Sequence, residues 1–88
     1  MEIRKKIRWN PEKAALLWEI RGISMENVRE EIEHHRFGLR RNSRGQLMFR
    51  IELEEYPVLV PFVESDEHIF LKTAFRSRKM KSDRERHP

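Results

Sequence analysis

Residues 47–75 carry the clearest pattern of apolar and polar positions in the chain. Residues 47–54 and 68–75 alternate between the two classes, as half-buried strands do. Residues 58–63 are apolar throughout, which is typical of a strand covered on both faces in the middle of a sheet. The links between these segments are short and polar, which favours antiparallel neighbours. We therefore predict a three-stranded meander, with a bulge at Pro61, because proline cannot donate a hydrogen bond within a central strand.

The first half of the chain predicts a strand followed by two helices. Residues 3–9 alternate apolar and charged, and their basic outer face fits either an edge strand or a phosphate-binding surface. Asn10 is positioned to cap the first helix, and Gly22 to end it in the left-handed conformation. Ser24 caps the second helix, and the short link makes either a helical hairpin or a sharp corner. The first helix has a broad apolar face: Ala14, Leu17, Trp18 and Ile20. The second has a narrow apolar stripe: Met25, Val28 and Ile32.

A short strand around Phe37 and Leu39 and a turn at residues 42–45 complete the predicted order β-α-α-β-β-β-β. Helices with apolar stripes must cover one face of the sheet, so the predicted class is α+β. We expect two N-terminal helices packed on one face of a four- to five-stranded, mainly antiparallel sheet. Residues 1–78 form a single domain in this prediction, and residues 79–88 a basic C-terminal tail or short helix.

Composition narrows the classes of function. The 88 residues include no cysteine, which excludes disulfides and thiolate metal sites. No apolar run approaches the ~20 residues of a membrane span, so the expected protein is soluble, cytoplasmic and without membrane contact. The net charge is +4 and its distribution is uneven: residues 36–50 hold five arginines and no acid, whereas residues 12–35 hold six acids. Two explanations fit this segregation: a footprint for a polyanion, or a solvated surface with a disordered basic tail.

The candidate chemistry is basic. Lys72 and Arg76 are four residues apart and are predicted to project from one strand face, which Arg78 continues. Cations at steps of about 6.5–7 Å match neighbouring phosphates. His34 and His35 lie at the end of the second helix. Either one can act as a general base, or both can stabilise the helix through its dipole. Adjacent helical residues point about 100° apart, so these two histidines do not predict a metal site.

Three segments together resemble the BrnT family of type II toxins, within the RelE-like toxin fold. Residues 7–13 (IRWNPEK) resemble its opening strand and helix cap, and residues 21–28 (RGISMENV) its turn into the second helix. Residues 69–79 (IFLKTAFRSRK) resemble its last strand, which ends in two basic residues. The chain departs from the family at residues 45–48 (GQLM), where the family has a glycine-glutamate-arginine segment.

The resemblance implies a small ribonuclease that blocks translation and is held inactive by an antitoxin encoded beside it. Its partners would be RNA and this cognate antitoxin, for instance of the ribbon-helix-helix type, in a hetero-oligomer. No metal or other cofactor is expected, because a base takes the 2′-OH proton and cations stabilise the phosphorane. The catalytic candidates are Arg78, Lys72, His35 and His34, with Tyr56 as a further candidate base. The RNA-binding candidates are Arg76, Lys79, Arg50 and Arg40.

A non-catalytic binding module is the alternative, using the same basic face for nucleic acid or for an acidic partner segment. Either way, we expect a partner to cover Lys72, Arg76 and Arg78. Phe70 is predicted to share the strand face of Lys72 and to provide an apolar anchor there.

Overall fold

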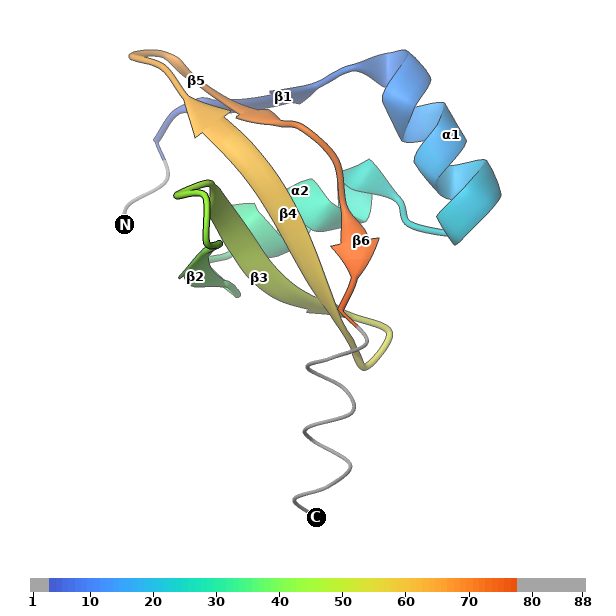
Figure 1. The fold of residues 1–88 in the computed structure, drawn as a ribbon. Helices are drawn as coiled ribbons and strands as arrows, with labels where there is room; N and C mark the ends of the chain where they lie inside the picture. The colour runs from blue at the N-terminus through green and yellow to red at the C-terminus, as the bar shows by residue number, and fades with distance from the viewer. Residues whose placement is uncertain (1–3, 78–88) are drawn as a thin grey trace, which may run out of the picture.

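The computed structural model describes residues 4–77 and confirms the α+β class (Figure 1). Its elements follow in chain order: β1 (Lys6–Trp9), α1 (Pro11–Arg21), α2 (Met25–Glu33), β2 (Gly38–Arg41), β3 (Leu47–Leu53), β4 (Tyr56–Glu64), β5 (His68–Leu71) and β6 (Phe75–Arg76). The sheet runs β1-β5-β4-β3-β2, and β6 also pairs with β4. It has six strands rather than the four or five predicted, because the last predicted strand is divided into β5 and β6. Neither described helix is long and apolar enough to cross a membrane.

The predicted helix ends are confirmed in atomic detail. The side chain of Asn10 accepts hydrogen bonds from the backbone N–H groups of Glu12 (2.8 Å) and Lys13 (3.3 Å). Gly22 ends α1 with φ of 65°, a value that costs little only for glycine. The Ser24 hydroxyl accepts from the N–H of Asn27 at 3.3 Å and so begins α2. The three-residue link turns the chain sharply between the two helices (Figure 1).

One face of the sheet, here called the inner face, packs against α2 (Figure 1). The core is formed there by alternate residues of the strands and by the apolar stripe of α2: Val28, Ile32, Phe49, Ile51, Val58, Val60, Phe62, Ile69 and Leu71. The opposite, outer face carries no helix among residues 4–77. All but one of the strand pairs are antiparallel; the exception joins β1 to β5.

Helix α1 contributes much less to the core than its sequence predicts. Of the four residues expected on its apolar face, only Leu17 is buried, whereas Trp18 is 63% exposed and Ile20 is 74% exposed. Figure 1 shows the cause, since α1 lies beside the sheet near β6 instead of over its centre. A helix in this position buries a narrow strip, so a large apolar surface of α1 remains in contact with water.

Pro61 is accommodated by a bulge, but not in the strand that contains it. The register between β3 and β4 is unbroken from Leu53–Tyr56 to Met48–Pro61. On the other side of β4, Phe62 pairs with Leu71, but Leu59 pairs with Phe75, so one extra residue lies between β5 and β6. The bulge therefore lies opposite Pro61, in the neighbouring strand.

This bulge reverses the faces that the sequence predicts for the two residues of β6, Phe75 and Arg76. Lys72 follows the buried Leu71 and belongs to the outer face, as does its neighbour Phe70. Arg76 pairs with the buried Val58 and belongs to the inner face. The prediction that Lys72 and Arg76 share a face is therefore wrong, because an inserted residue shifts the period-two alternation by one.

The hairpin between β3 and β4 closes through a two-residue turn, shorter than the gap between the strands that the sequence predicts. Leu53 pairs directly with Tyr56, and Glu54 and Glu55 have φ of 52° and 66°. Two positive φ angles match the hairpin turn that strongly favours Asn-Gly. Residues with a β-carbon are strained in this region by about 1–2 kcal/mol each.

We expect the double substitution Glu54→Asn/Glu55→Gly to raise the free energy of unfolding by about 1 kcal/mol, because it relieves this strain. Urea denaturation of both proteins measures the change. The control is Glu54→Gln/Glu55→Gln, which removes the same charges and leaves the backbone preference nearly unchanged. Equal stabilisation by the glutamine variant would assign the effect to charge and contradict the turn assignment.

Candidate nucleic-acid interface

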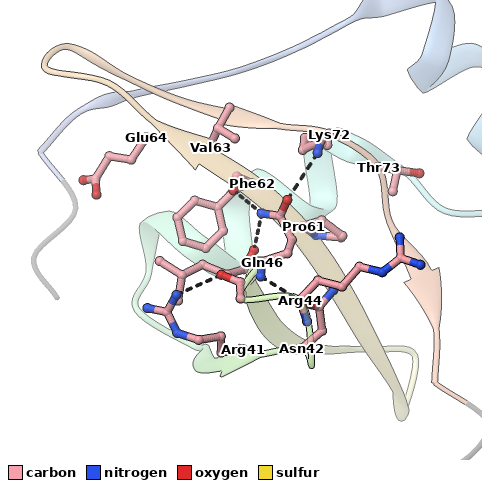
Figure 2. Close-up of a pocket in the computed structure, with 12 residues that line it drawn as sticks. Arg41, Asn42, Arg44, Gln46, Pro61, Phe62, Val63, Glu64, Lys72 and Thr73 are labelled. Carbon is pink, nitrogen blue, oxygen red and sulfur yellow. Dashed lines mark hydrogen bonds between the residues drawn. The ribbon is translucent and has the colours of Figure 1, made fainter.

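An open groove of about 800 Å³ lies where β3 begins and β4 continues past it toward its pairing with β5 (Figure 2). We call it the cationic groove. The β2–β3 turn forms one wall, residues 61–64 of β4 form the floor, and the bulge forms the other wall. Its polar lining residues are Arg41, Asn42, Arg44, Gln46, Glu64, Lys72 and Thr73.

Gln46 holds the centre of the cationic groove. Its side-chain amide donates to the carbonyl oxygens of Phe62 (2.7 Å) and Leu47 (3.0 Å). Both donors of the amide are thus occupied, so its oxygen faces the groove and accepts from Lys72 Nζ at 3.2 Å (Figure 2). The lysine ammonium is thereby oriented by a neutral group, and its charge remains uncompensated within this contact.

The β2–β3 turn presents two arginines to the same groove. Asn42 Oδ1 accepts from the backbone N–H groups of Arg44 and Gln46, both at 2.9 Å, and this pair of bonds shapes the turn. Gly45 occupies the left-handed position with φ of 84°. Arg41 donates to the carbonyl of Gly45 at 2.8 Å. The guanidinium of Arg44 has no protein partner among residues 4–77 and extends along the groove (Figure 2).

The electrostatic balance of the cationic groove is positive. Among residues 4–77, Glu64 is the only acidic residue in its lining, and Lys5 neutralises it through an ion pair of 2.9 Å. Arg41, Arg44 and Lys72 have no carboxylate partner within the described chain. Three cations around one open hollow match an anion with several oxygens, such as the phosphate backbone of a nucleic acid.

We expect Gln46→Glu to lower the free energy of unfolding by about 1–3 kcal/mol at neutral pH, because a carboxylate would face two carbonyl oxygens without donors. The ion pair gained with the exposed Lys72 returns at most about 1 kcal/mol. Denaturation measured across pH tests this: the deficit should be smallest in acid, where a protonated carboxyl can donate, and should grow as pH rises through its pKa. A variant as stable as the wild-type protein at pH 7 would contradict the assigned contacts of Gln46.

The sequence-predicted site residues that the structure describes are distributed over both faces, and of these only Lys72 lines the cationic groove. Arg76 donates to the carbonyl of Arg21 at the end of α1, and its guanidinium lies 5.9 Å from the ring centre of Tyr56. Arg76 therefore ties the sheet to the α1–α2 link. Arg78 and Lys79 lie outside the described residues.

The two histidines are also outside the cationic groove. His34 Nδ1 lies 2.8 Å from the carbonyl oxygen of Glu30 at the end of α2. His35 stacks on Phe37 with ring centres 6.1 Å apart, and Phe37 packs on Phe49 of the inner face. Tyr56 is likewise absent from the groove lining. No candidate base predicted from the sequence is thus brought to Lys72 within residues 4–77.

Arg40 and Arg50 belong to the outer face by register, since they pair with Met48 and Gly38 respectively. Arg50 approaches Glu52 at 3.7 Å, and its buried Nε has no hydrogen-bond partner in the part of the chain that the structure describes. Neither arginine lines the cationic groove. Among the titratable groups, Arg36 has a raised pKa, caused chiefly by its hydrogen bond to Glu31.

Sequence reasoning missed three residues of the groove: Arg41, Arg44 and Gln46. The acid-free run at residues 36–50 was a signal for the two arginines. Gln46 had no such signal, because its role depends on the carbonyl of Phe62, sixteen positions away. No group of three or more histidine, cysteine, aspartate or glutamate side chains within residues 4–77 is arranged to hold a metal ion.

Fold and groove together define an α+β protein with a cationic groove beside a sheet face that no helix of residues 4–77 covers. No protein-family model matches the chain, and no curated protein matches it. The resemblance to BrnT toxins therefore stays a prediction.

Proposed function

We propose that this protein is the RNA-cleaving toxin of a type II toxin-antitoxin system, and that it acts in the cytoplasm on RNA bound in the cationic groove. The observation that carries the proposal is that Arg41, Arg44 and Lys72 line one open hollow whose only acid among residues 4–77, Glu64, is paired with Lys5. The resemblance of three segments to the BrnT family supports the choice of RNA cleavage.

An exposed apolar patch beside the groove favours a single-stranded substrate. Val63 lines the groove and pairs with Phe70, and these side chains are 50% and 40% exposed. Aromatic side chains beside cations bind single strands, because bases stack on the ring while the phosphates meet the charges. In this proposal Phe70 stacks a base, and Lys72 and Arg44 contact the neighbouring phosphates.

In the proposed cleavage, the 2′-oxygen attacks the adjacent phosphorus and the bond to the 5′-oxygen breaks. A 2′,3′-cyclic phosphate and a 5′-hydroxyl end result. Lys72 and Arg44 stabilise the additional negative charge of the phosphorane. Neither histidine lines the groove, and Glu64 is paired with Lys5 and belongs to the inner face. In this proposal a water molecule therefore accepts the 2′-OH proton, and a water molecule gives a proton to the leaving 5′-oxygen.

A non-catalytic RNA-binding module is the second candidate. It is favoured by one observation: His34, His35 and Tyr56, the bases that the sequence suggests, do not line the groove. Binding would then use the same cations and the same aromatic side chain, with a steep salt dependence and without cleavage.

The test uses the whole chain and a 5′-labelled single-stranded RNA in buffer with EDTA. The proposal expects products with cyclic phosphate ends, loss of cleavage in Lys72→Ala, and growth arrest when the wild-type protein is induced in cells. Binding without products and without arrest would assign the module instead. Absence of both binding and cleavage would overturn both functions.

Arg76 and Lys72 provide a paired test of which face meets RNA. We expect Arg76→Ala to lower the free energy of unfolding by about 1–2 kcal/mol, because its bond to Arg21 and its interaction with Tyr56 are removed, and to leave RNA affinity nearly unchanged. Lys72→Ala should weaken RNA binding and leave the free energy of unfolding nearly unchanged. Fluorescence anisotropy with labelled RNA and urea denaturation measure the two quantities. Equal loss of affinity in both variants would contradict the division of faces.

The antitoxin is the proposed protein partner at the cationic groove. An acidic segment that folds on binding would neutralise Arg44 and Lys72, with Phe70 as an apolar anchor. Arg76 is removed from this surface, because it lies on the inner face. Association should be fast at low salt and slow down as salt rises.

A further inference from the structure

A second groove, of opposite character, lies between the two helices. It has a volume of about 400 Å³, and we call it the interhelix groove. Its apolar lining is contributed by β1, α1 and α2: Trp9, Ala14, Ala15, Trp18 and Met25. It shares the lining residues Trp18, Ser24 and Asn27 with a further hollow of about 270 Å³. We call these two adjoining hollows together the channel.

Trp18 marks this channel as a contact surface. The indole lines both hollows and is nevertheless 63% exposed, because α1 is displaced to the side of the sheet. Exposed tryptophan is enriched among the few residues that supply most of the energy at protein interfaces. Nothing within residues 4–77 covers it.

The rim of the channel is acidic. Glu26, Glu30 and Glu54 line it. The carboxylates of Glu26 and Glu54 form no hydrogen bond or ion pair within residues 4–77, whereas Glu30 interacts electrostatically with Arg36. Two further acids there are compensated, since Glu31 pairs with Arg36 at 2.7 Å and Glu52 approaches Arg50 at 3.7 Å. Arg76 is the one cation in the lining, and it is bound to the end of α1.

We propose that the interhelix groove binds an amphipathic helix of a partner protein, with apolar residues directed at Trp18 and lysine or arginine along its flanks. Apolar anchors at helical spacing fit the apolar lining around Trp18, and basic flanks complement the carboxylates of Glu26, Glu30 and Glu54. Nucleic acid is disfavoured here by the same carboxylates. Binding at this surface does not depend on RNA cleavage, because the channel lies among the helices and shares no lining residue with the cationic groove.

A synthetic peptide tests the surface directly. The probe has about 18 residues, roughly 27 Å as a helix, with leucine at helical spacing and lysine elsewhere. One comparison peptide replaces every lysine by glutamate, and another scrambles the order of the residues. The lysine peptide alone should bind saturably, with affinity that falls as salt rises. Both tryptophans of the chain line the channel, so their emission should shift to the blue on binding.

Matched variants locate the binding. Trp18→Ala should weaken binding of the lysine peptide by about tenfold or more. Ile20→Ala, on the same helix but outside the channel, should leave this binding unchanged. Glu26→Gln/Glu30→Gln should weaken binding of the lysine peptide by about tenfold. Its control, Glu12→Gln/Glu19→Gln, removes the same charge from α1 and should have no effect. All four variants should bind RNA as the wild-type protein does, so failure here is distinguishable from failure of the proposed function.

Three results would overturn the inference. The first is absence of saturable binding by the lysine peptide. The second is equal binding by Trp18→Ala and Ile20→Ala. The third is self-association of the wild-type chain in sedimentation equilibrium that Glu26→Gln/Glu30→Gln abolishes, because the occupant would then be the cationic surface of a second copy.

Discussion

Reversing two charges in the cationic groove should abolish the activity of the protein while leaving it folded. We expect Arg44→Glu/Lys72→Glu to weaken binding of single-stranded RNA by about 100-fold or more, since each charge-assisted hydrogen bond contributes about 1.5–3 kcal/mol. Arg44 has no protein partner among the described residues, and Lys72 has only the exposed contact with Gln46. Their replacement therefore removes little that stabilises the fold.

The control must separate local contacts from net charge. The double variant lowers the net charge from +4 to 0, a change of −4. Lys13→Glu/Arg29→Glu makes the same change on the two helices, away from the groove. We expect it to bind RNA within a few-fold of wild type. RNA titrations at several salt concentrations measure both affinity and salt slope, and the slope should fall by about 0.7 for each phosphate that the protein no longer neutralises.

Induction in cells extends this experiment. The groove variant should no longer arrest growth, whereas the helix variant should arrest it as wild type does. Equal loss of RNA binding in both doubles would show that net charge, rather than the groove, governs the interaction. It would remove the principal support for the proposed function.

Phe49→Ala should be the most destabilising single substitution considered, at about 3–5 kcal/mol. Phe49 is fully buried on β3, stacked on Phe62 with ring centres 4.1 Å apart and edge-on to Phe37 at 5.0 Å. Its removal leaves a cavity where β3, β4 and the end of α2 meet. Small domains have only about 5–15 kcal/mol of total stability, so the loss is a large fraction of the whole.

Urea denaturation measures this prediction, with Phe70→Ala as the matched control. Phe70 is the same residue type on the same sheet but is 40% exposed on the outer face, so its replacement should lower stability by less than about 1 kcal/mol. Comparable losses in the two variants would show that the core is not centred on Phe49. The pair also separates stability from RNA binding, because only Phe70→Ala should weaken base stacking.

The local features of this fold are contained in the sequence. Asn10, Gly22 and Ser24 begin and end the helices as predicted, because capping depends on residues within three or four positions. The alternation in residues 47–54 predicts the buried face of β3, since side chains on a strand alternate whatever the partner strand is. Together these signals were enough to establish the α+β class and its antiparallel meander.

Only the tertiary structure decided where the functional side chains lie. The bulge opposite Pro61 moves Arg76 to the inner face, whereas Lys72 stays on the outer one. It depends on how β4 pairs with two different strands, which no local pattern contains. Gln46 likewise acquires its role from a carbonyl brought near by the fold.

The position of α1 was also decided by tertiary packing. Its sequence is apolar on more than one side, and such a helix fits either over a sheet or beside it. The sheet is covered by α2, so α1 buries Leu17 and leaves Trp18 and Ile20 in water. The sequence determined which segments form helices and strands, because those choices depend on nearby residues. The register and the position of α1 relative to the sheet determined the two grooves, because both bring together residues distant in the chain.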